Sequence, residues 1–232
     1  MNIVITGASK GLGKAMALAF AADGHNLLLC ARQPVALYDT MAQIQNQFPN
    51  ITVHATIADL QNEQEAKDFA HWCTNKADVD VLINNAGRFE PGSIHTEADG
   101  ILTDMLSANL LSAYHVTRGI LPAMINKQQG HIFNICSIAS LQAYANGGSY
   151  SISKFALLGF SKNLREELKQ HHIKVTAVMP GAAYTDSWSE SGVDPKRIME
   201  ANDIAQMVVA ATKLSPQAVV EDIVLRPQLG DL

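Results

Sequence analysis

The chain alternates short, continuous apolar runs with longer segments in which apolar and polar positions mix at helical spacing. Continuous apolar runs are typical of strands buried on both faces, as in parallel sheets, whereas apolar side chains that recur every three or four residues indicate amphipathic helices. We therefore expect seven strands, over residues 2–6, 25–31, 51–55, 79–83, 131–136, 173–179 and 218–225.

Helices are predicted between these strands. Gly24 ends the first helix, Phe48, Pro49 and Asn50 end the second, a break is expected near Pro122 in the long fourth one, and Asn202 is expected to cap the last. Regular strand–helix alternation predicts an α/β fold, with a doubly wound parallel seven-stranded sheet (a Rossmann fold) and helices on both faces. The helical segments cover residues 14–22, 35–47, 62–76, 96–127, 155–164 and 202–213.

Composition narrows the class of protein. A chain of 232 residues with 17% charged residues, low for a globular protein, is typical of a large buried parallel sheet. We see no low-complexity linker and no repeat beyond the strand–helix unit, so we expect one domain over 1–232, with a short loop at about 182–200. The net charge of −5 argues against nucleic-acid and anionic membrane partners.

The cysteines and the start of the chain bear on location. Cys30, Cys73 and Cys136 are widely spaced and form no metal-binding pattern with histidine, so free thiols in a reducing compartment are expected and no metal. The chain opens directly on strand-like residues, without a secretory leader, and no apolar run reaches membrane-spanning length. A cytoplasmic protein is the prediction.

A glycine-rich turn joins the first strand to the first helix. Gly7 would permit the tight turn, Gly11 the approach of a pyrophosphate, and Gly13 the close packing of helix and strand. The spacing differs from the commonest dinucleotide fingerprint, and a simple tight turn is the alternative. The strand–turn–helix context favours a phosphate site.

The residues after the second strand bear on the choice of cofactor. A cofactor without a 2′-phosphate usually meets a carboxylate there, but Arg32 occupies this region and no carboxylate follows until Asp39. The guanidinium of Arg32 suits a phosphate, and Lys10 offers a second cation; solvated surface cations are the alternative for both. Together they favour NADP(H), with NAD(H) possible.

Three further polar positions stand where a ligand would bind. Asp59 would face an adenine or cap the following helix. Residues 84–87, Asn-Asn-Ala-Gly, form a turn at the carboxyl end of a strand, where open α/β sheets bind ligands. Asn109 lies among apolar helix positions, so its amide needs buried partners unless it is exposed or locally bonded.

Acid–base chemistry is suggested by Tyr150 and Lys154, which are four residues apart and so share one helix face, with the Ser137 hydroxyl at the end of the preceding strand. A free phenol titrates near pH 10, about 4 kcal/mol from ionising at neutrality, and a neighbouring ammonium favours the phenolate. Seen alone, such a pair is usually surface decoration. Ser140 competes with Ser137 as the hydroxyl that faces a substrate.

Taken in order, these motifs resemble the classical short-chain dehydrogenase/reductase family over nearly the whole chain. The matching residues are Thr6-Gly7-x-x-x-Gly11-x-Gly13, Asn84-Asn85-Ala86-Gly87, Asn109, Ser137, Tyr150-x-x-x-Lys154 and Pro180-Gly181-x-x-x-Thr185. The resemblance implies catalytic roles for four of them: Tyr150 as acid/base, Lys154 on the nicotinamide ribose, Ser137 on the substrate oxygen and Asn109 beside a relay water. It implies substrate contacts for Ser137 and Tyr150, and cofactor contacts for Gly7, Ser9, Lys10, Gly11, Leu12, Gly13, Arg32, Asp59, Asn85, Gly87, Tyr150, Lys154, Pro180 and Thr185.

The function expected from this resemblance is an NADP(H)-dependent oxidoreductase that interconverts a carbonyl compound and its alcohol. The alternatives are an NAD(H)-preferring alcohol dehydrogenase of the same family, a non-catalytic nucleotide-sensing module, and an epimerase or dehydratase on a related fold. In this family the long helices commonly pair across subunits, so the resemblance implies a homodimer or homotetramer.

The substrate side of the site is less defined. The chain ends soon after the last strand and the 182–200 loop is compact, which predicts a fairly open pocket. Its expected walls suit an aromatic or modestly apolar carbonyl compound as the small-molecule partner. The expected wall residues are Arg88, Phe89, Leu141, Gln142, Tyr144, Tyr184 and Trp188.

Overall fold

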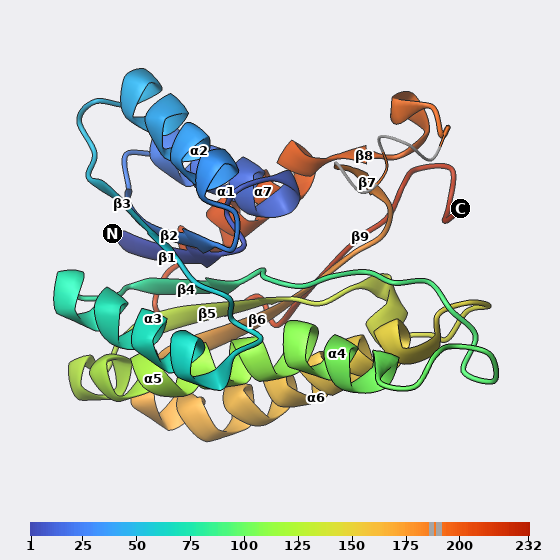
Figure 1. Cartoon of the computed structure of the whole chain (residues 1–232). Helices are drawn as coiled ribbons and strands as arrows, with labels where there is room; N and C mark the ends of the chain where they lie inside the picture. The colour runs from blue at the N-terminus through green and yellow to red at the C-terminus, as the bar shows by residue number, and fades with distance from the viewer. Residues whose placement is uncertain (186–187, 189–191) are drawn as a thin grey trace.

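One seven-stranded sheet forms the centre of the molecule (Figure 1). The computed structural model describes residues 1–185, 188 and 192–232. All neighbouring strands of the large sheet pair in parallel, in the order β3-β2-β1-β4-β5-β6-β9, which confirms the predicted fold class. The strands are β1 (Asn2–Thr6), β2 (Asn26–Ala31), β3 (Val53–Ile57), β4 (Val81–Asn84), β5 (Gly130–Ile135), β6 (Ile173–Pro180) and β9 (Asp222–Leu225).

Helices cover both faces of this sheet. In Figure 1, α1, α2 and α7 lie above it, and α3, α4, α5 and α6 lie below. Each layer buries apolar side chains against its own face of the sheet, so that two main hydrophobic clusters form. The helices are α1 (Gly11–Ala22), α2 (Pro34–Gln47), α3 (Glu63–Lys76), α4 (Ile101–Leu106), α5 (Ser112–Lys127), α6 (Gly148–Leu168) and α7 (Ala201–Thr212).

The strand order reverses at β1, which pairs with β2 on one side and with β4 on the other. Thr6, the last residue of β1, therefore lies beside the end of β4, and the chain segments that follow the two strands diverge to opposite faces. In open α/β sheets this reversal leaves a crevice outside the carboxyl ends of the strands. The predicted glycine turn and the 84–87 turn both flank it.

The predicted break in the long helical region is misplaced. Pro122 lies inside α5, and the interruption falls instead at a π-helical turn, Ser107–Leu111, between α4 and α5. Asn109 sits within this wide turn and is buried. Such π turns occur frequently at functional sites, because the extra residue turns a side chain toward a partner that a regular helix would miss.

The segment after β6 contains a short pair of strands. β7 (Ala183–Tyr184) pairs with β8 (Met199–Glu200), while residues 186–187 and 189–191 of the predicted 182–200 loop lie outside the described residues. Glu200, not Asn202, caps α7, because Glu200 and Asp203 exchange side-chain-to-backbone hydrogen bonds and so satisfy two donors at once. Within the described part of the chain, none of the helices is long and apolar enough to cross a membrane.

Candidate functional site

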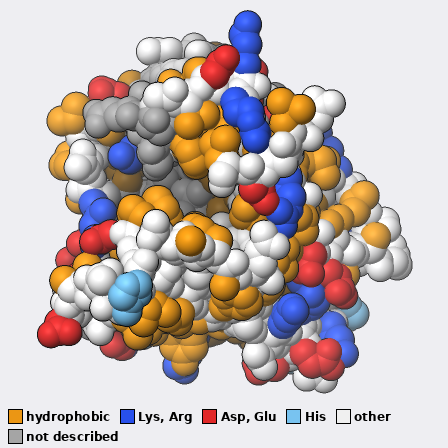
Figure 2. Space-filling view, turned by 90° about the vertical axis from the view of Figure 1, so that its right-hand side faces the viewer, with side chains coloured by type: hydrophobic (Ala, Val, Ile, Leu, Met, Phe, Trp, Pro, Cys, Tyr) orange, Lys and Arg blue, Asp and Glu red, His pale blue; other side chains and the backbone are white. Residues whose placement is uncertain are grey.

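A cleft of about 760 Å³ opens at the carboxyl ends of the strands and brings most of the predicted site together. Figure 2 looks onto this side of the molecule and shows the surface hollowed, with hydrophobic side chains on the border. Its volume is within the range of small-molecule sites. The predicted site residues that line it are Gly7, Ser9, Lys10, Gly11, Leu12, Arg32, Asp59, Asn85, Gly87, Ser137, Tyr150, Lys154, Pro180 and Thr185.

The glycine turn has a backbone shape that requires glycine. Gly7 and Gly11 have φ values of +66° and +54°, in the left-handed region. Gly13 does not line the cleft; a Cβ added there would lie 2.2 Å from the Gly7 carbonyl oxygen, so its role is close packing of α1 on the turn. Lys10 occupies the N-cap position of α1, and its side chain makes no capping hydrogen bond to the first turn. These features fit the pyrophosphate of a dinucleotide.

Asn85 fastens this turn to the end of β4. Its Nδ2 donates to the carbonyl oxygens of Thr6 (2.9 Å) and Gly7 (3.1 Å). In return, the backbone N–H groups of Asn85 and Ala86 donate to Thr6 Oγ1, each at 2.9 Å. Thr6 is thus a structural partner of the site that sequence reasoning did not single out, although it directly precedes Gly7.

The three residues predicted for the adenosine end all line the cleft. Arg32 and Lys10 are exposed and both line the cleft. Asp59 does not cap α3: Asn62 does, by accepting from the backbone N–H groups of the second and third helical residues. Asp59 Oδ1 instead accepts from Gln61 N–H at 3.2 Å and lines the cleft.

Asn109 is buried behind the cleft and is not part of its lining. Its amide reaches distant partners: Nδ2 donates to the Arg88 carbonyl oxygen (3.0 Å) and to Ser153 Oγ (2.9 Å), and Oδ1 accepts from Arg88 N–H (2.8 Å). The interpretation as an exposed or locally bonded asparagine is therefore wrong. Asn109 connects the π turn, the segment after β4 and α6.

Ser137, Tyr150 and Lys154 all line the cleft, whereas Ser140 does not. Ser137 is separated from the end of β5 by Cys136 alone. Its Oγ accepts a hydrogen bond from Ala139 N–H at 3.1 Å, while Ser140 Oγ accepts from Ser137 N–H at 3.2 Å. The competing hydroxyl is thus buried beneath the turn. Lys154 Nζ lies 5.8 Å from the centroid of the Tyr150 ring, on the same face of α6.

Burial dominates the ionisation of this pair. Tyr150 is half-buried as a residue, but its phenol is poorly solvated, which raises its pKa to about 12; a hydrogen bond with Ser137 acts in the opposite direction. Burial also lowers the pKa of Lys154 to about 8. Desolvation therefore sets the direction of the Tyr150 pKa shift, whereas the spacing had led us to expect a lowering of this pKa by Lys154.

The substrate side of the cleft has walls that the sequence predicted only in part. Arg88, Phe89, Gln142, Tyr144 and Trp188 line it, and the Phe89 ring packs edge-on against Tyr150 with centroids 4.8 Å apart. Leu141 and Tyr184 are not lining residues.

The C-terminal segment forms a wall that no sequence pattern indicated, since Asp231 and Leu232 also line the cleft. Arg197 holds this segment by donating to the backbone carbonyl oxygens of Gly230 (3.0 Å) and Asp231 (3.3 Å). The last residues of the chain thus contribute to the cleft wall, while the predicted open character of the pocket stays a prediction.

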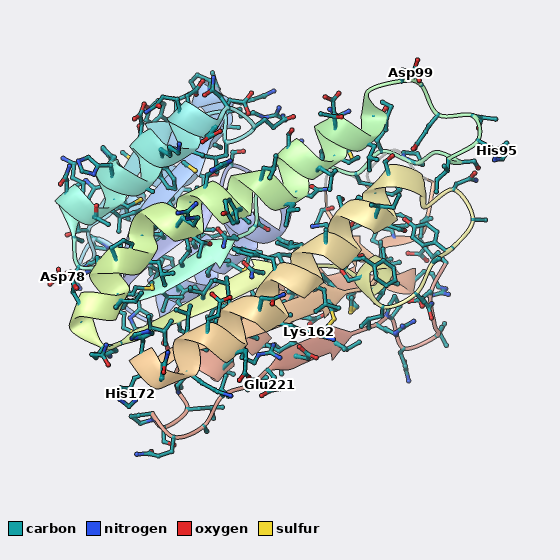
Figure 3. The ribbon with its side chains drawn as sticks, turned by 90° about the horizontal axis from the view of Figure 1, so that it is seen from below. Asp78, His95, Asp99, Lys162, His172 and Glu221 are labelled. Atoms are coloured by element: carbon teal, nitrogen blue, oxygen red, sulfur yellow. The ribbon has the colours of Figure 1, made fainter. Side chains whose placement is uncertain are left out.

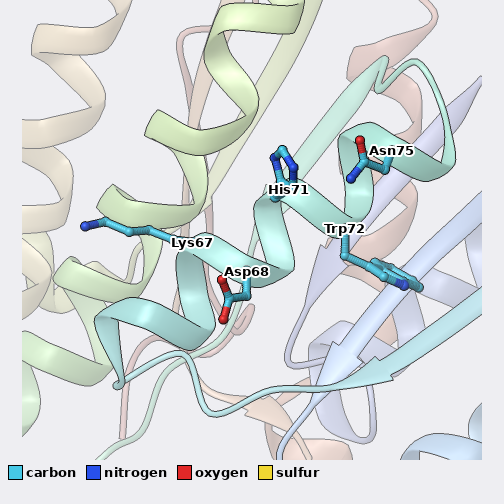
Figure 4. A pocket seen from close by; sticks show the side chains of 5 residues that line it. All are labelled: Lys67, Asp68, His71, Trp72 and Asn75. Carbon is cyan, nitrogen blue, oxygen red and sulfur yellow. The ribbon is translucent and has the colours of Figure 1, made fainter.

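A second cavity, of about 520 Å³, lies on the outer face of α3 (Figure 4). It shares no lining residue with the cleft and contains none of the predicted site residues. Among the residues that the structure describes, no group of three or more His, Cys, Asp or Glu side chains is placed to hold a metal ion. The residues that line this second cavity are Lys67, Asp68, His71, Trp72 and Asn75.

Comparisons with known proteins agree with the family resemblance and with the fold. The family model for short chain dehydrogenases matches residues 1–196. The chain is 32% identical to a sepiapterin reductase of Chlorobaculum tepidum, over 99% of this chain and 97% of that protein. Among solved structures, it is similar to a metagenomic short-chain oxidoreductase in complex with NADP (30% identity, TM-score 0.85, covering 98% and 97% of the two chains) and to a variant of actinorhodin polyketide ketoreductase with NADPH (25% identity, TM-score 0.88, covering 100% and 97%).

The glycine turn, the Asn85 bridge and the Tyr150–Lys154 pair thus occur in a chain whose sequence and fold match those proteins along most of its length. On this evidence the chain belongs to the short-chain dehydrogenase/reductase family of oxidoreductases.

Proposed function

We propose that the protein is an NADP(H)-dependent oxidoreductase that interconverts a small carbonyl compound and its alcohol, with Tyr150 as the acid/base. The observation that carries this proposal is the single cleft whose lining runs from Gly7 and Arg32 to Ser137, Tyr150 and Lys154. A phosphate-binding turn and a proton-transfer group on one cavity are what hydride-transfer chemistry needs.

The residues divide the chemistry between them. A bound nicotinamide dinucleotide supplies the hydride in reduction and accepts it in oxidation. Tyr150 donates its phenol proton to the carbonyl oxygen in reduction and accepts one from the alcohol in oxidation. The Ser137 hydroxyl donates to the same oxygen and so stabilises the charge that develops there. Lys154, on the same helix face as Tyr150, would contact the nicotinamide ribose and favour the phenolate. Asn109, from behind the cleft lining, would support a relay water.

The proposed cofactor contacts are the cleft-lining set described above, with Gly13 acting through the shape of the turn. Arg32 and Lys10 provide cations for a 2′-phosphate, and the NADP-bound structures to which this chain is similar support the same choice. We propose that Asp59, which lines the cleft, contacts the adenine.

The proposed substrate is an aromatic or modestly apolar carbonyl compound, because Phe89, Tyr144 and Trp188 line the substrate side. The similarity to a sepiapterin reductase makes sepiapterin a sensible member of the test set. We further propose one nucleotide-binding domain over residues 1–232, a cytoplasmic location, and a homodimer or homotetramer formed through α5 and α6.

A panel of aldehydes, ketones, quinones and sepiapterin, assayed by nicotinamide absorbance with NADPH and with NADH, tests this function. We expect NADPH oxidation with at least one carbonyl compound and a loss of at least about 100-fold in Tyr150→Phe, which keeps the ring but removes the proton donor. Faster turnover with NADH would favour the NAD(H)-preferring alternative. Tight NADPH binding with no turnover across the panel would favour the nucleotide-sensing module, and full activity of Tyr150→Phe would exclude the mechanism.

A further inference from the structure

The first turn of α6, which carries Tyr150, is capped by a side chain from a distant segment. Gly147, the residue at the N-cap position, has no side chain to offer. Glu97 takes this place: its Oε2 accepts from the backbone N–H of Ser149 at 3.3 Å, and its Oε1 accepts from Ser149 Oγ. A carboxylate at a helix N-terminus satisfies open N–H groups and interacts favourably with the helix dipole.

The approach of this segment to α6 is close enough to constrain the backbone. Gly148 has a φ of +37°, and a Cβ added there would lie 2.4 Å from the Gly92 carbonyl oxygen and 2.8 Å from Glu97 Oε2. Two more hydrogen bonds join the same segments: Gly92 N–H donates to the Asn146 carbonyl oxygen (3.0 Å), and Ser93 Oγ donates to Asn146 Oδ1 (2.7 Å). Residues 92–97 are therefore clamped onto residues 146–149.

The segment that contains Phe89 and Glu97 contacts both the Tyr150 ring and the residue before Tyr150. Ser149, which Glu97 holds, is 1% exposed and directly precedes Tyr150. Phe89, shortly before the clamping segment, packs edge-on against the Tyr150 ring. Figure 3 shows the loop that carries His95 and Asp99 at the same end of the molecule as the start of α6. A shift of this loop would therefore move both the helix turn below Tyr150 and the ring beside it.

We propose that Glu97 is a positioning residue for Tyr150, which acts through Ser149 to hold the first turn of α6 in the orientation that proton transfer requires. This inference rests on the proposed function for its kinetic consequence, while the clamp itself is testable without turnover. Because Glu97 does not line the cleft, it touches neither substrate nor cofactor in this arrangement. Its effect should fall on kcat, through misplacement of the proton donor, and not on the binding of the dinucleotide phosphates.

The test compares Glu97→Ala and Glu97→Gln with Asp99→Asn, which removes one charge from an exposed position in the same loop. We expect kcat for carbonyl reduction to fall at least about fivefold in Glu97→Ala, because the uncapped turn no longer holds the Tyr150 phenol in the orientation for proton transfer. Glu97→Gln, which keeps one acceptor oxygen, should lose less, and Asp99→Asn should match the wild type. The Kd for NADPH, from fluorescence quenching, should stay within about twofold in all three.

Two further measurements separate positioning from general stability. Amide hydrogen exchange, followed by mass spectrometry, should accelerate in peptides that cover residues 145–152 of Glu97→Ala and stay unchanged in α5. Ser149→Ala combined with Glu97→Ala should reduce kcat no further than Glu97→Ala alone, because both changes break one connection.

A failure of this inference can be distinguished from a failure of the proposed function. If the wild type reduces no carbonyl compound, the proposed function fails, and the exchange measurement still decides the clamp. Unchanged exchange at residues 145–152 in Glu97→Ala would overturn the inference. So would a kcat within twofold of the wild type, or acceleration of exchange throughout α5 together with weaker NADPH binding, which would show only a loss of global stability.

Discussion

Lys154 donates a hydrogen bond from Nζ to the carbonyl oxygen of Ile135, at a distance of 2.8 Å. This bond joins α6 to the end of β5, so that the buried ammonium is held between the helix and the sheet. Burial of a lysine ammonium is costly unless such partners are present. The arrangement keeps a titratable cation beside Tyr150 and makes the protein's stability depend on pH in a predictable direction.

Lys154 should make the folded state more stable, relative to the unfolded chain, as pH rises from about 8 to about 10. Its pKa is lowered to about 8, whereas an unfolded lysine titrates near 10.4, so the unfolded chain binds more protons in this window. Tyr150 has the opposite effect above about pH 10, because its pKa is raised to about 12. Urea unfolding of the wild type and Lys154→Met at pH 7 and pH 10 measures this. The stability of the variant relative to the wild type should fall by ~1 kcal/mol or more over that interval; a constant difference would contradict the prediction.

Arg32→Asp should change the cofactor preference. The guanidinium lines the cleft where a 2′-phosphate would bind, and a carboxylate there would repel the phosphate and accept from a ribose hydroxyl. We expect the ratio of kcat/KM for NADPH to that for NADH to fall at least about tenfold, which corresponds to ~1.4 kcal/mol. Lys14→Asp, a change of the same charge within α1 outside the cleft lining, serves as the control. An unchanged ratio in Arg32→Asp would remove Arg32 from the proposed phosphate site.

Gly13→Ala should damage the phosphate-binding turn, because the added Cβ would lie 2.2 Å from the Gly7 carbonyl oxygen and 2.5 Å from Asn85 Nδ2. Relief of this overlap requires backbone movement, which typically costs ~1–3 kcal/mol. We expect lower stability in urea and weaker NADPH binding. Gly159→Ala is the matched control: it lies in α6 with nothing within 4 Å of the added Cβ, and it should raise stability by ~0.5–1 kcal/mol. Equal effects of the two changes would contradict the packing argument.

Arg197→Ala should loosen the wall of the cleft formed by the C-terminal segment. Arg197 donates to the carbonyl oxygens of Gly230 and Asp231. When these two bonds are lost, the ion pair between Arg226 and Asp231 still holds the segment. We expect KM for the carbonyl substrate to rise about three- to tenfold with kcat little changed, since the segment contributes binding surface and not proton transfer. Lys196→Ala, at the neighbouring exposed position, should leave KM unchanged. A fall in kcat with constant KM would show that the segment acts on the chemistry instead.

Local sequence patterns were sufficient to predict the parallel sheet and to predict that the main site residues lie together. Apolar runs and glycine turns reflect backbone geometry and burial over a few residues, so the strand–turn–helix at Gly7–Gly13 and the helical pair Tyr150–Lys154 could be predicted directly. The sheet then places everything that follows its carboxyl ends at one edge, which is why Asn85, Ser137 and Pro180 line the same cleft.

Tertiary structure alone decided the features that depend on contacts between distant segments. The sequence by itself determined the sheet, the glycine turn and the spacing of Tyr150 and Lys154, because those follow from local conformation and burial. The contacts of Asn109 in the π turn, the cap that Glu97 provides for α6 and the return of the C-terminal segment under Arg197 join residues 21 to 52 positions apart. The ionisation of the Tyr150–Lys154 pair likewise depends on the tertiary structure, because its pKa values are set by desolvation inside the folded cleft and not by the four-residue spacing that first drew attention to it.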